Sequence, residues 1–274
     1  MNRIVASLVL LLAATAPAEV AAAVHLKVNG NSVTGDVSLP GGIEADVTLS
    51  FENVVGLNLA NLGLSVQRID LLDPTFLARL SGASVPAAFP LLIRIEPPAN
   101  GGLSFSGVAT LEIHTHNLQF TTNCPLRLFK APLGGPFEDI TAGMGVGSYR
   151  ARGTSGGFSE FILVADPLPI DQVIAGKFNR LQTLLERYDG SMPEALYADL
   201  EARLAAARAA TSRGAIREAS REIDGFLAVV EQHSGSDIPN VWRSARDVEN
   251  VAGYLRAAAT TLRFSLGLKS DLAA

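Results

Sequence analysis

The sequence contains a single cysteine, Cys124, so no disulfide can form within the chain. The residues around it, 121–125, include no cationic side chain that would activate the thiol. We therefore expect Cys124 to be a small buried side chain and not a reactive nucleophile. Stability must then come from the burial of apolar side chains, and 48% of the residues are hydrophobic.

Charge is sparse as well. Charged residues make up 18% of the chain, and the formal net charge is −5. No run of lysine or arginine provides the basic patch that nucleic acids or anionic membrane surfaces require. We therefore expect no nucleic-acid partner.

Aromatic residues make up 6% of the chain; Tyr149 is its first tyrosine, and no tryptophan precedes it. A glycosidase needs two carboxylates across a cleft, usually beside aromatic platforms for the sugar rings. The carboxylate pairs of this first part, Glu44 with Asp46 and Glu138 with Asp139, lack such platforms. We expect these carboxylates to lie on polar faces of strands.

Long apolar runs are absent after the first residues of the chain. At its start, Arg3 precedes an apolar run over residues 4–14, and small residues follow at Ala21–Ala23. This order predicts a cleavable export signal over residues 1–23, and the run is shorter than the roughly 18 residues that span a bilayer. We expect a mature chain that starts near Val24, is secreted or periplasmic, and has neither a membrane span nor a lipid-bearing cysteine.

The part that follows the signal, residues 24–165, has the pattern of short strands. Asn29-Gly30 between two apolar runs predicts a hairpin. Residues 43–51 alternate polar and apolar side chains, and residues 103–120 predict two strands divided near Gly107. With no helical pattern between them, these strands predict an all-β antiparallel sandwich or barrel.

Two shorter patterns complete this β domain. Asp73 followed by proline predicts a capped helix over residues 73–80. Residues 147–152 and 158–164 predict a last pair of strands, joined by a glycine-rich hairpin turn over residues 153–157.

Two prolines within residues 166–170 predict a linker, after which the apolar spacing becomes helical. Four stretches carry apolar residues at three- and four-residue steps: 174–188, 196–207, 216–230 and 241–262. The links between them are short, so residues 171–268 predict an all-α antiparallel four-helix bundle. The expected chain is multi-domain, with the β domain first and the bundle second.

Within the helical part, residues 177–232 carry a pattern of apolar and glycine positions. Its members are Leu184 and Tyr188 before Gly190, Leu200, Leu204 and Ala207, then Gly214, and Ala219, Ile223 and Phe226. This stretch resembles a FIMAH-type module of exported bacterial proteins. The resemblance implies an accessory, non-catalytic module, and the layout of the whole chain is similar to uncharacterised exported bacterial proteins.

His114-Thr115-His116 is the best candidate for a metal site. On a strand, residues i and i+2 point to the same side, so both imidazoles can reach one ion. Glu112 lies on the same face and is the first candidate for a third ligand. The alternative is a pair of solvated histidines on the polar face of a strand, since no other metal-ligand spacing accompanies them.

Residues 153–157 also match the G-x-S-x-G string of serine hydrolases, with Ser155 as the nucleophile. That motif requires a strand before the serine and a helix after it. Here a strand-like run follows, which favours a turn without catalytic function.

These patterns favour an exported, non-catalytic binding or structural protein of the bacterial envelope or exterior, with no cofactor. Its ligand is left open between a protein and a surface glycan, and a subunit of an envelope assembly is a third possibility. The competing hypothesis is a hydrolase or metal-dependent enzyme with its site on the β domain, near His114 and His116.

Overall fold

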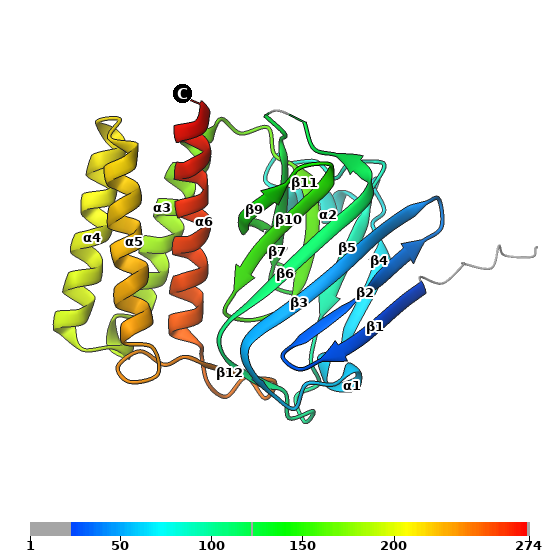
Figure 1. The fold of residues 1–274 in the computed structure, drawn as a ribbon, viewed down its shortest axis with the longest axis horizontal. Helices are drawn as coiled ribbons and strands as arrows, with labels where there is room; N and C mark the ends of the chain where they lie inside the picture. The colour runs from blue at the N-terminus through cyan, green and yellow to red at the C-terminus, as the bar shows by residue number, and fades with distance from the viewer. Residues whose placement is uncertain (1–22, 122, 273–274) are drawn as a thin grey trace, which may run out of the picture.

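The computed structural model describes residues 23–121 and 123–272 (Figure 1). An antiparallel β-sheet region comes first and C-terminal helices follow it, as the sequence predicts. The predicted export signal, residues 1–23, lies outside the described residues except for Ala23, which begins the first strand. No helix of the described ranges is long and apolar enough to cross a membrane.

The first sheet has seven strands, in the order β1-β2-β3-β6-β10-β9, and β12 pairs with β6. All of these pairings are antiparallel. The bounds are β1 Ala23–Asn29, β2 Ser32–Leu39, β3 Ile43–Val55, β6 Ser104–Gln119, β9 Thr141–Gly145, β10 Ser148–Ser155 and β12 Val241–Arg243.

The second sheet has five strands, in the order β4-β5-β11-β7-β8. Its pairings are antiparallel as well. The bounds are β4 Leu64–Arg68, β5 Leu91–Ile95, β7 Leu126–Ala131, β8 Glu138–Asp139 and β11 Glu160–Ala165.

The two sheets share one apolar core. The predicted inward face of residues 43–51 is confirmed, because its alternate side chains, Val47 and Leu49 among them, are buried. These side chains belong to the same cluster as Ile93 of β5 and Leu128 of β7. The outward side chains of β3 therefore lie on the opposite face of the first sheet, where charged residues can gather.

Two local predictions are confirmed. Asn29 pairs with Ser32 across the β1–β2 turn, and Gly30 there adopts φ +55, which glycine reaches without strain. The side chain of Asp73 accepts a hydrogen bond from the Thr75 amide and caps α2, Pro74–Leu77. A 3₁₀ turn, Ala78–Leu80, continues that helix.

The predicted division of residues 103–120 into two strands is wrong, because β6 is continuous. Gly107 adopts φ +78 and bends the strand without ending it. The register with β3 shifts between Phe51 and Asn53, and the ladder then resumes on the far side.

The predicted hairpin turn over residues 153–157 is also wrong. β10 belongs to the first sheet and β11 to the second, so this segment carries the chain from one sheet to the other. A Cβ atom on Gly156 would lie 2.5 Å from the backbone nitrogen of Tyr254. The glycine therefore allows the segment to approach the last helix closely, which a hairpin turn would not require.

Four long helices follow the sheets: α3 Ile170–Arg187, α4 Glu194–Ser212, α5 Ile216–Gln232 and α6 Val251–Leu272. Shorter elements are α1, Leu59–Leu62, in the β part and a 3₁₀ turn, Asp189–Ser191, between α3 and α4. Apolar residues of the four long helices, among them Phe178, Leu204, Phe226 and Leu262, share a second core.

The start of the last helix differs from the prediction. The expected helical stripe began at Val241, but Val241–Arg243 forms β12 and α6 begins at Val251. The cause is Trp242, whose ring stacks on Phe105 at 5.4 Å and meets Phe158 edge-on at 5.1 Å in the core between the sheets. Burial of this large ring in the β core overrides the helical spacing.

Helix α6 lies along the first sheet (Figure 1). Two nitrogens of the Arg256 guanidinium lie 2.8 and 2.7 Å from the two carboxylate oxygens of Glu52 on β3. Asn250, just before the helix, donates a hydrogen bond of 2.7 Å to the carbonyl of Gly107. The predicted boundaries, with domains over 24–165 and 171–268, stay a prediction.

Candidate functional site

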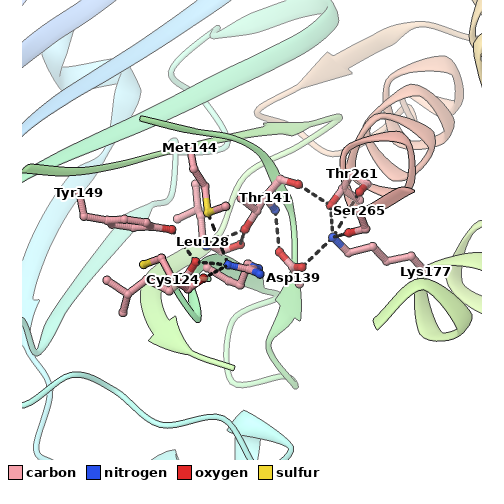
Figure 2. Close-up of polar contacts among 11 residues, drawn as sticks. Cys124, Leu128, Asp139, Thr141, Met144, Tyr149, Lys177, Thr261 and Ser265 are labelled. Atoms are coloured by element: carbon pink, nitrogen blue, oxygen red, sulfur yellow. Dashed lines mark hydrogen bonds and ion pairs between the residues drawn. The ribbon is translucent and has the colours of Figure 1, made fainter. Parts of the chain in front are cut away.

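A buried polar network joins the helices to the β part (Figure 2). Lys177 of α3 lies 2.6 Å from the carboxylate of Asp139 on β8. The same amine donates to the hydroxyls of Thr261 and Ser265 on α6, at 2.6 and 2.9 Å. All three N–H groups of the amine are therefore used within the protein, and Lys177 has no donor left for a ligand.

The network continues into the β part through Thr141. Its carbonyl accepts a 2.8 Å hydrogen bond from Thr261, and its hydroxyl accepts one of 2.8 Å from the Leu128 amide. Deeper still, the Tyr149 hydroxyl donates to the carbonyl of Leu126 at 2.7 Å, and burial raises the pKa of this phenol well above its usual value. These polar groups contact one another within the protein, which indicates a structural role.

A cavity of about 540 Å³ lies beside this network, between the second sheet, residues 154–159, and helices α3 and α6. Its walls carry aromatic rings from both parts of the chain, namely Phe129, Phe137, Phe158, Tyr188 and Tyr254. A cavity of this size, mostly apolar with a few polar groups, is typical of a site for a small molecule.

Most cations in the cavity wall are neutralised by carboxylates. The ion pairs are Lys177 with Asp139 at 2.6 Å, Arg180 with Glu138 at 3.1 Å, Arg187 with Glu249 at 2.7 Å, and Arg246 with Glu96. These pairs leave little positive charge free to attract a ligand.

Lys130 of β7 is the exception. Its amine donates a 2.6 Å hydrogen bond to the Ser155 hydroxyl and lies 5.9 Å from the centre of the Tyr254 ring. No carboxylate oxygen of the described residues lies within 4.0 Å of it. Burial, together with the charge of Arg180, lowers the pKa of the Lys130 amine to about 8, while the more distant charges of Glu138 and Glu96 oppose the shift.

Ser155 holds the amine in place. Its hydroxyl accepts from Lys130 and from the Gly157 amide at 3.3 Å, and donates to the Gly157 carbonyl. An ammonium has three donors, and Ser155 accepts only one. The arrangement can therefore bind an anionic group through the remaining N–H groups of Lys130.

The sequence-predicted metal ligands lie elsewhere, on the outer face of the first sheet. His114 and His116 point to the same side of β6, as their spacing predicts. Asp46 of β3 stands directly opposite His114, and its two carboxylate oxygens lie 3.1 Å from His114 Nδ1 and 3.2 Å from His116 Nε2. Glu44 lies 3.5 Å from His116 Nδ1.

Glu112, the predicted third ligand, points toward two arginines. Its carboxylate oxygens lie 3.5 Å from Arg150 Nε and 3.3 Å from Arg152 Nε, both on β10. The structure thus brings Asp46 to the two histidines and places Glu112 one cross-strand row away. The metal set of His114, His116 and Glu112 stays a prediction.

The other candidate functional residues from the sequence lie in different parts of the structure. Of the two carboxylate pairs, Glu44 and Asp46 lie by the histidines, whereas Glu138 and Asp139 bind Arg180 and Lys177. Ser155 ends a strand and no helix follows it, so the strand–turn–helix context of the hydrolase motif is absent there. Cys124 is buried, as expected.

Sequence reasoning missed Lys130 and Asp46 as members of these sites. Lys130 stands in the strand Leu126–Ala131, whose other residues are apolar except for Arg127, and a charge within such a strand is a signal for a lined cavity. In the sequence, Asp46 stands out only as one member of an acidic pair with Glu44. Its place beside His114 depends on the register of β3 with β6, which no local pattern encodes.

Comparison with known proteins shows a protein-family model that matches most of the chain. This model, described as a family of unknown function (DUF6689), matches residues 6–269. No curated protein matches the chain. The match spans both the β part and the helices, and the resemblance of residues 177–232 to a FIMAH-type module stays a prediction.

Proposed function

We propose that this chain, which belongs to the family of unknown function DUF6689, is an exported, non-catalytic binding protein of the bacterial envelope or exterior. Its ligand is a small apolar molecule that carries an anionic group. The ligand occupies the cavity between the second sheet and helices α3 and α6, with the anionic group on Lys130.

The observation that carries this proposal is the amine of Lys130, which forms no ion pair among the described residues, whereas the other cations of the cavity lining do. Burying a cation without a counter-ion costs folding free energy. A role in folding alone therefore does not explain why a lysine occupies this position. An anionic ligand removes that cost by supplying the missing charge. The aromatic side chains around the amine, such as Phe129 and Tyr254, suit the apolar remainder of the ligand.

The architecture we propose for this protein is a β-sandwich followed by an antiparallel four-helix bundle. The shared core of the two sheets supports the sandwich, and the common core of α3 to α6 supports the bundle. The charge and apolar pattern of residues 1–23 supports export to the periplasm or exterior. The helical part then acts as an accessory module that forms one wall of the cavity.

Calorimetric titration with 2-naphthoate tests the proposal, since this probe joins an apolar ring system to a carboxylate. We expect 2-naphthoate to bind and the neutral 2-naphthamide to bind much more weakly. Lys130→Met should abolish the preference for the anion, because the methionine keeps the stem and removes the charge. Lys27→Met, at an exposed lysine of β1, is the matched control and should bind as the parent chain does. Equal binding of the acid and the amide would contradict the proposal.

One contact favours a second function, a hydrolase with its site on the β domain. The 2.6 Å contact of Lys130 with Ser155 matches the serine–lysine arrangement, in which a neutral lysine takes the proton of the attacking serine. Labelling with a fluorophosphonate distinguishes the two functions. The binding protein should stay unlabelled, whereas labelling that is lost in Ser155→Ala would establish the hydrolase.

A further inference from the structure

The outer face of the first sheet carries a row of ionisable residues that crosses five strands. Neighbouring strands align His25 with Asp36, Asp36 with Asp46, Asp46 with His114, and His114 with Arg150. None of these residues lines the cavity with Lys130. The row therefore has no part in the proposed binding of an anionic ligand.

We propose that Asp46, His114 and His116 form a binding site for a divalent transition-metal ion such as Zn²⁺. Each residue offers one ligand atom, and the three atoms lie within 4.8 Å of one another. Imidazole nitrogens and a carboxylate oxygen are ligands that Zn²⁺ prefers. Three protein ligands leave a fourth position open to water or to another molecule.

The spacing of the ligand atoms suits this ion. Metal–ligand bonds of about 2.0–2.1 Å in a tetrahedral site place neighbouring ligand atoms about 3.3 Å apart. Asp46 Oδ2 lies 3.1 Å from His114 Nδ1 and Asp46 Oδ1 lies 3.2 Å from His116 Nε2, so a rotation of the carboxylate brings one oxygen to both rings. Paired strands hold all three residues, so the site needs side-chain adjustments and no movement of the backbone.

Glu44 supplies the support that metal-binding histidines usually have. It lies 3.5 Å from His116 Nδ1, on the ring nitrogen opposite to the one that faces Asp46. A carboxylate in this position accepts a hydrogen bond from Nδ1–H, which fixes the tautomer and leaves Nε2 free for the metal.

The surrounding charge is mixed, and its balance is negative. Arg150 Nη2 lies 3.4 Å from His114 Nδ1 and opposes a cation there. Glu112 draws the same arginine away, with its carboxylate 3.5 Å from Arg150 Nε. Asp36, which stands opposite Asp46 on β2, adds a further carboxylate next to the site. Glu112 and Asp36, together with the carboxylates of the site itself, therefore outweigh the positive charge of Arg150, which faces the histidines.

Titration of the metal-free full chain with ZnCl₂, followed by calorimetry, tests the site. We expect a single ion to bind, and His114→Gln, His116→Gln and Asp46→Asn each to abolish binding. Glu44→Gln should weaken binding by about 10-fold, as is usual for a carboxylate that orients a ligand. Titration with CoCl₂ should give the visible absorption bands of a four-coordinate cobalt ion, which a merely structural histidine pair would not produce.

Two control variants distinguish this site from other histidine–carboxylate contacts. His233 pairs with Asp237 at 2.7 Å without a second histidine, so His233→Gln should leave zinc binding unchanged. Glu112→Gln should also retain binding, and loss of binding in that variant would mean that Glu112 and not Asp46 is the third ligand. Absence of any zinc uptake by the parent chain, or equal uptake by Asp46→Asn, would overturn the proposal.

Discussion

The amine of Lys177 on α3 lies 2.6 Å from the carboxylate of Asp139 on β8, and the two side chains are only 7% and 8% exposed. This ion pair is buried where the helices meet the β part. Burial lowers the pKa of the Lys177 amine, while the charge of Asp139 opposes that shift. The pair therefore couples the two parts of the chain. Removal of either partner leaves the other charge buried without a counter-ion.

Lys177→Met should destabilise the protein by about 3–5 kcal/mol, because it leaves the Asp139 carboxylate buried and unpaired. The double variant Lys177→Met/Asp139→Leu should regain most of that loss, since it removes both charges. Urea unfolding followed by far-ultraviolet circular dichroism measures both effects. Equal stability of the single and double variants would show that the charges are not coupled.

The β part and the helices should unfold in one cooperative transition. Trp242 is the only tryptophan, and its ring lies in the β core although it precedes α6 in the chain. Its fluorescence thus reports on the β core, while circular dichroism at helical wavelengths reports on α3 to α6. The two unfolding curves should coincide. Separate midpoints would mean that the parts unfold independently, despite the contacts of Lys177 and Asn250.

Removal of the Lys130 charge should stabilise the protein at neutral pH. The pKa of this amine falls to about 8 on folding, so at pH 7 the folded state carries a cation that burial disfavours. Lys130→Met should raise the free energy of unfolding at pH 7 by about 1–3 kcal/mol, after allowance for partial solvation of the amine. Urea unfolding of both proteins at pH 7 measures this gain.

The gain should shrink as the pH rises. Between pH 8 and about 10.4 the unfolded chain keeps the Lys130 proton while the folded chain loses it, so the parent protein becomes more stable relative to the variant. Lys177 is present in both proteins, and its contribution cancels in the difference. A gain that is constant from pH 7 to 10 would show that the pKa of Lys130 is not lowered.

His116 should titrate above the usual histidine pKa. Its hydrogen bond with Asp46 raises the pKa more than burial lowers it, and Glu44 raises it further. Proton NMR of the histidine ring signals in metal-free protein should show a pKa above 6.5, which falls in Asp46→Asn. The stabilisation from this contact is present below the unfolded pKa and is lost as the pH rises through the folded one.

An unshifted His116 in the parent chain, or the same value in Asp46→Asn, would show that the carboxylate does not contact the ring in solution. His233 of the helical part forms a separate pair with Asp237. The variant His233→Gln lacks that ring, so its spectrum identifies the signals of His233.

Local patterns predicted the elements that depend on local physics. The period-two alternation of residues 43–51 identified a buried face, and Asp73 with Pro74 identified a capped helix. The same reasoning failed at Val241, where helical spacing was present but burial of Trp242 between the sheets determined the outcome. It also failed at residues 153–157, because a crossing between two sheets uses the same glycines as a hairpin turn.

The sites were harder to predict than the elements. The spacing of His114 and His116 identified two residues that share a face, since this follows from strand geometry alone. Asp46 and Ser155 reach their partners only through strand register and the packing of separate segments. The sequence shows Lys130 in a mostly apolar strand, but the cavity beside its amine forms only when the second sheet packs against α3 and α6.

The most direct test of the anionic-ligand pocket is a crystal structure of the protein soaked with 2-naphthoate. We expect the naphthalene ring to lie between the second sheet and helix α6, with a carboxylate oxygen in hydrogen-bond contact with the Lys130 amine. A structure in which naphthoate lies elsewhere, or lies in the cavity with its carboxylate directed away from Lys130, would contradict it.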